Sequence, residues 1–361
     1  MTPQTVLLLS LAVSGSVVLG ADTLAALTVS AAAGGPLLGA VLARASKPGR
    51  VLAWATGTYA VGLGILMISL GRVPLWLSLA LALAAGSLTS IISGGWSSRL
   101  PDVVHADRLG QASVVDAATY YIAGLAGPAG AGLLVIAWGG LAVAVLLAVL
   151  LLVTVPAAWQ MPPVSREGGR SRGVLREAWS GFQSIGSSRS LRRATLVSVM
   201  SYVGFGMTGV IAPLIGRSDF GQAGFGGLLL SAVSLGALIA TALYARRTAL
   251  MSPDFVVGLT PLLMALAFLL LLVPSGTVAL LGMVVLGLAD GPQLAALIAV
   301  RHRESQDATR SQVFMTGSSL KIAAASLGTA VAGHLGASST HLALLAACAA
   351  QVAALLVYIA L

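Results

Sequence analysis

Apolar stretches separated by short polar loops recur along the whole chain. Each is about 20 residues long, the length at which an α-helix crosses a bilayer core about 30 Å thick. The pattern predicts an all-α polytopic membrane protein. Its twelve predicted transmembrane helices cover residues 5–20, 23–43, 51–70, 75–95, 112–135, 139–158, 193–215, 224–245, 255–273, 277–299, 311–335 and 340–360. The first is short for a full crossing, so an eleven-helix arrangement stays open.

The composition excludes a soluble globular protein. Hydrophobic residues make up 57% of the 361 positions and charged residues only 9%, and the mean hydropathy is +0.97. A soluble domain has about 25% charged residues. The net charge of +9 comes from arginines in loops between apolar stretches, which argues against a face that binds nucleic acid. The single cysteine, Cys348, excludes an internal disulfide.

Loops on alternate sides of the predicted helices share the basic residues unequally. One set of loops holds 17 of the 20 Lys and Arg residues. The other set holds Arg72 and Arg217, and Lys321 lies inside a predicted helix. Because cytoplasmic loops are enriched in Lys and Arg, the first set is predicted to be cytoplasmic. We therefore expect a multi-pass protein of the inner (cytoplasmic) membrane with both termini in the cytoplasm.

The longest hydrophilic segment, from Gln160 to Arg193, separates six predicted helices from six others. We expect an N-terminal six-helix bundle over residues 1–158, a cytoplasmic linker over 159–192 and a C-terminal six-helix bundle over 193–361. Within the linker, GVLREAWSGFQSI (residues 173–185) has the pattern of a short amphipathic helix on the inner membrane surface.

Internal similarity supports a duplication. GGPLLGAVLAR, ending at Arg44, resembles GALIATALYAR, ending at Arg246, at an offset of 202. Residues 111–134 resemble residues 312–335 at an offset of 201. Two six-helix pseudo-repeats are the arrangement of the major facilitator fold, in which the site lies between the halves near the membrane midplane. The chain resembles the major facilitator superfamily in this respect.

Two charged residues lie inside apolar stretches. Asp290 interrupts TVALLGMVVLGLADGPQLAALIAV, and Lys321 interrupts SQVFMTGSSLKIAAASLGTAVAGHL. Counted from the basic loop between them, both are about ten residues deep, or about 15 Å in a helix, close to the bilayer centre. Such charges are costly and mark substrate or ion pathways. The pair is predicted either to carry substrate or coupling-ion charge or to hold helices ten and eleven together.

Two further residues are candidates for the substrate or proton pathway. Asp116 lies near the inner end of helix five, where it either carries protons or bonds the adjacent loop or the arginines Arg99 and Arg108. Tyr120 aligns with Lys321 in the repeat, which gives the first half a hydroxyl at the corresponding depth. A packing role is the alternative for Tyr120.

The loop between helices two and three, GAVLARASKPGR, runs from Gly39 to Arg50. It resembles the signature loop of the major facilitator superfamily, in which a Gly, an Asp-Arg pair and a Gly-Arg pair latch the inner face shut. Arg44, Gly49 and Arg50 match, but Ala43 stands where the family has Asp, and two residues are inserted before Gly49. The resemblance implies a gating role for this loop. Without the carboxylate, Arg44 and Arg50 are left to pair with helix ends or lipid. The alternative to a gating role is that these arginines are only part of the positive charge usual in cytoplasmic loops.

Helix five contains YIAGLAGPAGAGLL, with Gly127, Pro128, Gly130 and Gly132. It resembles the Gly-Pro motif of drug and proton antiporters in this superfamily. Glycines let helices approach closely and an internal Pro bends the helix, so the motif implies a packed seal. Small-residue packing without export is the alternative. The surrounding segment, residues 97–134, resembles the exporter branch that contains enterobactin and macrolide efflux proteins.

The sequence therefore favours a secondary active transporter that exports a small amphipathic compound, such as a drug, siderophore or secondary metabolite, by proton-coupled alternating access. An importer or uniporter of a neutral metabolite and a transporter-like receptor without transport stay open. No Ser/His/Asp, Cys/His or phosphate-cradling arrangement is present, and the histidines are too scattered for a metal site. No enzyme, metal or cofactor is expected. The expected partners are a small-molecule substrate, protons and the lipid bilayer, with the protein a monomer.

Overall fold

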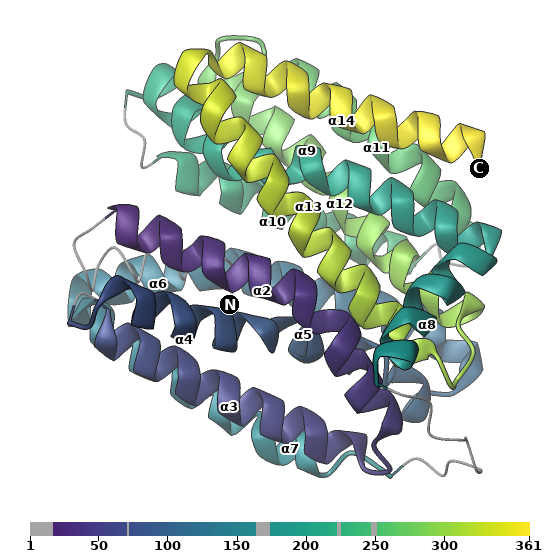
Figure 1. The fold of residues 1–361 in the computed structure, drawn as a ribbon. Coiled ribbons are helices and arrows are strands. Elements are labelled where there is room, and N and C mark those ends of the chain that lie inside the picture. The colour runs from purple at the N-terminus through teal and green to yellow at the C-terminus, as the bar shows by residue number, and fades with distance from the viewer. Residues whose placement is uncertain (1–16, 71, 164–173, 222–224, 247–250) are drawn as a thin grey trace. The chain divides into compact units, whose positions relative to one another are not determined.

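The computed structural model describes residues 17–70, 72–163, 174–221, 225–246 and 251–361, which form helices and no strand (Figure 1). The α-helices are α2 (Val17–Arg44), α3 (Pro48–Ser69), α4 (Leu75–Ser87), α5 (Thr89–Ser97), α6 (Leu109–Val153), α7 (Val155–Trp159), α8 (Val174–Ser187), α9 (Arg189–Asp219), α10 (Phe225–Ala245), α11 (Pro253–Leu270), α12 (Gly276–Glu304), α13 (Arg310–Ser338) and α14 (Thr340–Ala360). Two short 3₁₀ segments, η1 (Leu100–Asp102) and η2 (Ala106–Arg108), precede α6.

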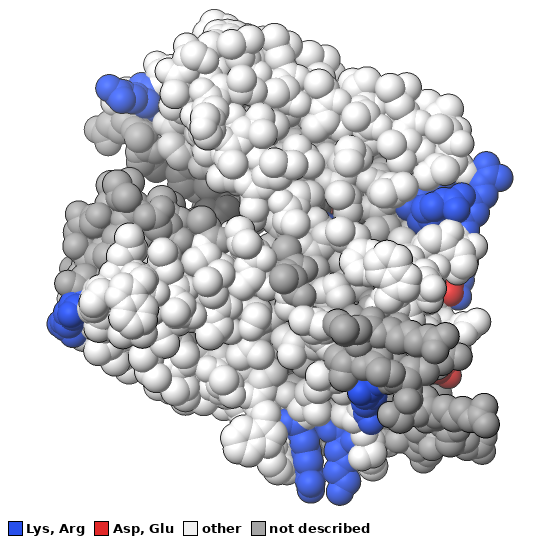
Figure 2. Space-filling view, viewed as in Figure 1, with Lys and Arg blue, Asp and Glu red and all other residues white. Residues whose placement is uncertain are grey.

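Among the described residues, eight helical segments are long and apolar enough to cross a membrane. The predicted spans 23–43, 112–135 and 311–335 are also helical, as α2, the first part of α6 and α13. The first predicted span, 5–20, lies almost wholly outside the described residues. On the face shown in Figure 2, the charged side chains leave broad uncharged areas between them. The prediction of an all-α polytopic membrane protein is confirmed.

The helix α6 is interrupted at Gly139. This residue has φ 79° and ψ 160°, inside a stretch that is otherwise helical. A residue with a side chain rarely adopts such a positive φ, whereas glycine does so without strain. The break between the spans predicted at 112–135 and 139–158 therefore lies at a glycine, the residue type that this backbone conformation requires.

The described chain divides into two compact units, each considered by itself. Unit 1 comprises Met1–Val103, Gly130–Ile185 and Ser305–Ala323; unit 2 comprises Val104–Ala129, Gly186–Glu304 and Ala324–Leu361. Each unit contains one segment from the other half of the chain. These two segments begin at Val104 and Ser305, which are 201 positions apart, the same offset as in the sequence repeat. One part of α6 thus packs with the second half of the chain, and the equivalent part of α13 packs with the first half. The boundaries proposed at 158 and 193 stay a prediction.

In unit 1, the first part of α13 packs closely on α2 and α5. A Cβ at Gly35 would overlap the Ser319 hydroxyl. The hydroxyls of Ser90 and Ser319 lie 3.0 Å apart, and those of Ser93 and Ser318 lie 3.1 Å apart. Small residues let helix backbones approach, and serine pairs link helices where water is excluded.

The helix α8 confirms the amphipathic helix predicted over residues 173–185. Trp179 and Phe182 are exposed, with ring centroids 5.5 Å apart. Gly181 instead faces α13, where a Cβ would lie 3.0 Å from the Gln312 carbonyl oxygen. One face of α8 is therefore packed, and the other presents the aromatic residues that favour a membrane interface.

In unit 2, a group of charges joins one end of α9, α11, α12 and α14. Asp254 Oδ1 is 3.1 Å from Arg193 Nη2, and Asp254 Oδ2 is 2.8 Å from Arg303 Nη1. The Arg193 guanidinium lies 4.8 Å from the centre of the Tyr358 ring. We call Arg193, Asp254, Arg303 and Tyr358 the Asp254 cluster. It fixes the ends of the four helices whose interiors carry the polar groups described below.

Candidate functional site

Asp290 is a buried carboxylate halfway along α12. Its side chain is 1% exposed. The hydroxyl of Tyr121, in α6, lies 2.7 Å from Asp290 Oδ2 and 2.8 Å from the Asp290 backbone oxygen. Both residues belong to unit 2. A single phenolic hydroxyl thus connects α6 to the side chain and the backbone of α12 at the middle of a predicted span.

A second tyrosine approaches the same carboxylate from α9. The side chain of Tyr202 hydrogen-bonds to Asp290. The elements α6, α9 and α12 therefore converge on one acidic group. A phenolic O–H donates to an ionised carboxylate, and such charge-assisted hydrogen bonds are about twice as strong as neutral ones. Protonation of Asp290 would weaken the attachment of both tyrosines.

Arg301 is the permanent charge closest to this group within α12. It follows Asp290 by eleven residues, which is about three helical turns, so the two lie on the same face. The Arg301 side chain is 4% exposed and lies within electrostatic range of Tyr120 and Tyr202. Tyr120 is 39% exposed. We call Tyr120, Tyr121, Tyr202, Asp290 and Arg301 the Asp290 site.

Glycines position α12 against α10. A Cβ at Gly287 would overlap the Val233 carbonyl oxygen, and one at Gly291 would overlap that of Ala237. The backbones are therefore too close for any side chain at these two positions. This packing turns the adjacent Asp290 away from α10, toward α6 and α9.

One helical turn from Asp290, a second set of buried polar side chains links four helices of unit 2. Ser201 Oγ donates to Gln351 Oε1 at 2.7 Å, and Gln351 Nε2 donates to the Ser201 backbone oxygen at 2.9 Å. Gln293 Nε2 donates to Thr260 Oγ1 at 3.0 Å. All four side chains are at most 2% exposed. We call Ser201, Thr260, Gln293 and Gln351 the polar layer.

The other predicted pathway residues fall at separate places. Lys321 is buried in α13 with 7% exposure, but it belongs to unit 1, whereas Asp290 belongs to unit 2. Their pairing stays a prediction. Asp116 is half-buried in α6, and its backbone oxygen accepts a hydrogen bond of 2.7 Å from Thr119 Oγ1. Arg99 forms an ion pair with Asp102, at 3.0 Å.

The signature-like loop is anchored within unit 1. Arg50 lies 5.4 Å from the centre of the Trp159 ring, at the end of α7. A Cβ at Gly49 would overlap the backbone of the same short helix, and one at Gly39 would lie 3.3 Å from the Gln312 Cα. Arg44 is exposed. A cation–π contact to Trp159 therefore gives Arg50 a partner other than the helix ends or lipid that the sequence suggested.

The Gly-Pro motif lies within α6. Gly127 is half-buried. Pro128, Gly130 and Gly132 are helical, but the packing around them lies outside the described side chains. The repeat partner of Gly127 is better defined, because a Cβ at Gly328 in α13 would overlap the Val203 carbonyl oxygen. The packing role of the motif itself stays a prediction.

Three members of the Asp290 site were missed in the sequence. The repeat alignment selects Tyr120 and not its neighbour Tyr121, because it indicates a depth in the membrane and not a helix face. Tyr202 resembles an ordinary aromatic residue in an apolar stretch. The predicted span 277–299 ends before Arg301, whereas α12 continues to Glu304 and buries this residue. A helical wheel would have placed Arg301 and Asp290 on one face, since eleven residues make about three turns.

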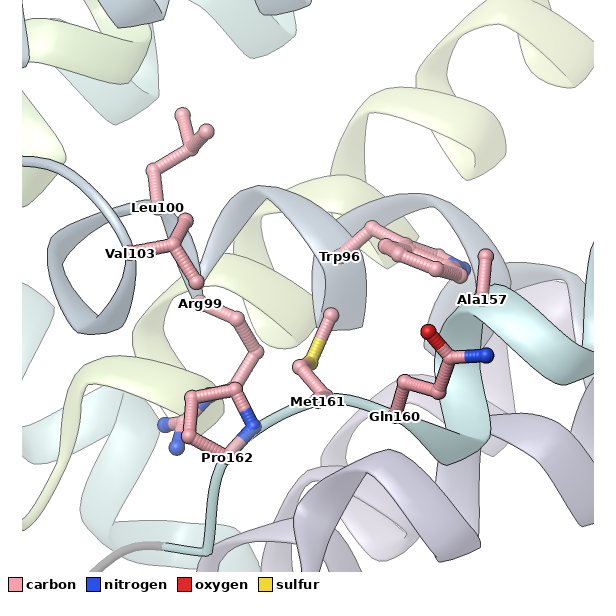
Figure 3. Close-up of a pocket in the computed structure, with 8 residues that line it drawn as sticks. All are labelled: Trp96, Arg99, Leu100, Val103, Ala157, Gln160, Met161 and Pro162. Carbon is pink, nitrogen blue, oxygen red and sulfur yellow. The ribbon is translucent and has the colours of Figure 1, made fainter.

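A pocket of about 420 Å³ opens elsewhere, at the end of α5 and α7 in unit 1. Its lining residues are Trp96, Arg99, Leu100, Val103, Ala157, Gln160, Met161 and Pro162 (Figure 3). The walls are mostly apolar. The Arg99 guanidinium is already bound to Asp102 and, at 2.9 Å, to the Ser311 hydroxyl. The pocket therefore offers little charge to a ligand, and it contains no member of the Asp290 site.

The described helices form a multi-pass bundle with a buried acid, a buried arginine and tyrosines in its interior, and the family match makes the protein a membrane transporter of the major facilitator type. The chain belongs to the major facilitator family described as transmembrane secretion effector, whose profile matches residues 15–361. Among curated proteins, no sequence matches this chain significantly.

Solved structures share the fold. The human organic anion transporter MFSD10 is 18% identical, the match covers 94% of this chain and 84% of that one, and the TM-score is 0.76. A bacterial homologue of the iron transporter ferroportin, in an outward-facing state, is 15% identical over 100% of this chain and 99% of that one, with a TM-score of 0.75. The E. coli fucose:proton symporter FucP is 14% identical over 99% and 96%, with a TM-score of 0.71. At these identities the likeness concerns the fold alone.

Proposed function

We propose that this transporter exports a small amphipathic compound from the cytoplasm in exchange for protons, and that Asp290 is the group that binds the proton. The observation that carries the proposal is the contact of the buried Asp290 carboxylate with Tyr121 and Tyr202. A carboxylate at mid-membrane exists in two protonation states, and each favours a different arrangement of its donors. Binding and release of one proton can therefore alternate the packing of α6 and α9 on α12.

Export is supported by the family description and by the earlier resemblance of residues 97–134 to the enterobactin and macrolide exporter branch. Coupling to protons is compatible with the fold, because the similar FucP is a fucose:proton symporter. The scarcity of charge in the described helices suits a substrate held by shape and apolar contact, with one or two charges for orientation.

Efflux assays in a host that lacks its own pumps test the proposal. Cells that express the chain should retain less of at least one dye or antibiotic in a panel than cells with an empty vector. An uncoupler that collapses the proton gradient should abolish the difference. A gradient-independent loss, or accumulation in place of loss, would contradict proton-coupled export.

The proposed orientation gives a prediction of topology. Reporters fused at Gly169 and after Leu361 should report the cytoplasm, and a reporter at Ser218 should report the outside. The reason is the concentration of Lys and Arg in one set of loops. Alkaline phosphatase and green fluorescent protein fusions measure this directly. An outside signal at Gly169 would overturn the orientation, because seven arginines flank that position.

A further inference from the structure

Two polar groups of unit 2 lie on the same four helices. The polar layer and the Asp254 cluster each take one residue from α9, α11, α12 and α14. Along α9, Ser201 follows Arg193 by eight residues, and along α11, Thr260 follows Asp254 by six. On α12, Arg303 follows Gln293 by ten residues, so at about 1.5 Å per residue the two groups are about 9 to 15 Å apart along the helices.

Two hydroxyls of α9 lie inside this interval. Thr195 and Ser198 precede Ser201 at steps of three residues, and all three are at most 1% exposed. Side chains three residues apart on a helix have Cβ atoms about 5 to 6 Å apart. One water molecule with two hydrogen bonds of about 2.8 Å spans that gap. The spacing therefore fits a file in which hydroxyls alternate with water.

Some polar atoms of this file form fewer hydrogen bonds than they are able to form. Within the described part of the chain, no residue hydrogen-bonds to Thr195 Oγ1, Ser198 Oγ or Gln293 Oε1. A buried polar group without a partner destabilises a protein, and internal water normally satisfies such groups with about three hydrogen bonds per molecule. In the described part of the structure no space for a water molecule borders these three atoms, so water enters this interval only when the packing around α9 loosens.

The file reaches the Asp290 site at one end and solvent at the other. Ser201 is the neighbour of Tyr202, which hydrogen-bonds to Asp290. Gln293 is one turn from Asp290 on α12 and lies 3.4 Å from Ser201 Oγ. At the other end, Arg303 of the Asp254 cluster is 44% exposed.

We propose that Thr195, Ser198, Ser201 and Gln293 line a proton path between Asp290 and the Asp254 cluster, which water fills when the packing around α9 loosens. The path rests on the proposed function, since it supplies the route by which Asp290 loses its proton to the cytoplasm. Asp290 gives its proton to the first water of the file. Each water or hydroxyl oxygen accepts one proton and passes on another, so every group is restored and one proton enters the solvent.

Silver accessibility tests the path without any transported substrate. In a Cys348→Ala background, Ser198→Cys should react with Ag⁺ added to the predicted cytoplasmic side of membrane vesicles, because Ag⁺ follows water into narrow spaces. The readout is lost labelling by a maleimide after denaturation. Thr208→Cys is the matched control on α9: Thr208 is also buried, but its hydroxyl is committed to the Phe205 carbonyl oxygen at 2.6 Å. Equal protection of both cysteines from Ag⁺ would overturn the path.

Proton uptake by Asp290 gives the second readout. The carbonyl stretch of its protonated carboxyl group, identified as the infrared band missing in Asp290→Asn, can be followed after a pH jump. Thr195→Val should slow the appearance of this band about tenfold, as about 1.4 kcal/mol of added barrier would. Thr208→Val should leave the rate unchanged.

The outcomes separate this inference from the proposed function. An Asp290 band that titrates at the same rate in Thr195→Val and in the wild type overturns the path and leaves proton binding by Asp290 intact. An Asp290 that never changes protonation between pH 5 and pH 9 overturns the proposed function itself. A Ser198→Cys that is accessible together with a slow Thr195→Val supports both.

Discussion

Replacement of Asp290 by Asn should reduce uphill export to the level of cells that lack the transporter. The variant keeps the shape of the side chain but removes the charge and the titration. The hydrogen bonds from Tyr121 and Tyr202 then lose their charged acceptor. Since hydrogen bonds to charged groups contribute about 1.5 to 3 kcal/mol and neutral ones about 0.5 to 1.5, the folded state should lose about 1 to 3 kcal/mol in all. Dye efflux and detergent-solubilised melting curves measure the two effects.

Lys321 supplies the companion test. If Lys321 neutralises Asp290 during the cycle, Lys321→Met alone leaves a buried unpaired charge, which costs about 3 to 5 kcal/mol in soluble proteins. The double variant Asp290→Asn/Lys321→Met should then recover expression. Recovered uphill transport would mean that the pair is structural, whereas folded protein limited to downhill flux would place coupling or substrate charge on these residues. Losses that simply add would show that the two residues are not partners.

Replacement of Gly328 by Leu should prevent folding of unit 2. Even a Cβ at this position would overlap the Val203 carbonyl oxygen, a backbone atom that cannot rotate away. Gly328→Ala alone should cost about 1 to 3 kcal/mol, the usual range for overpacking a close contact, and Leu should cost more. Expression, monodispersity and the melting temperature of the purified protein measure the effect.

Gly333 is the matched control on the same helix. No described atom lies within 4 Å of a Cβ built there. Gly333→Ala should be neutral or slightly stabilising, since Ala is favoured over Gly in a helix interior by about 1 kcal/mol. Equal damage from both Ala variants would show that α13 does not pack on α9 as the structure describes.

Features whose energetic cost depends only on the position of a residue along the chain could be predicted from the sequence. A charge in an apolar stretch is costly wherever it points, so Asp290 stands out without a structure. The same holds for the membrane spans and for the amphipathic helix α8. The positive φ of Gly139, the first residue of the predicted span 139–158, was not predicted.

The partners of Asp290 could not be predicted in this way, because they depend on helix rotation and on packing between distant segments. Tyr121 and Tyr202 are amphipathic, and from the sequence each could equally well be an aromatic residue that only packs against its neighbours. Their selection follows from the close approach of α12 to α10 at Gly287 and Gly291, which turns Asp290 toward them. The presence of the first part of α13 in unit 1 depends likewise on the contacts of Ser318 and Ser319, whose partners are more than 200 residues away in the chain.

Simultaneous measurement of proton and substrate movement tests the central claim most directly. Inside-out vesicles with an acidic lumen and an entrapped pH dye receive the dye or antibiotic that the efflux panel identifies. With the wild type, we expect the compound to accumulate in the lumen while the lumen becomes more alkaline. With Asp290→Asn, neither change should occur although the compound still binds. Uphill accumulation by the wild type without any change in lumenal pH, or proton movement that persists in Asp290→Asn, would contradict proton exchange through Asp290.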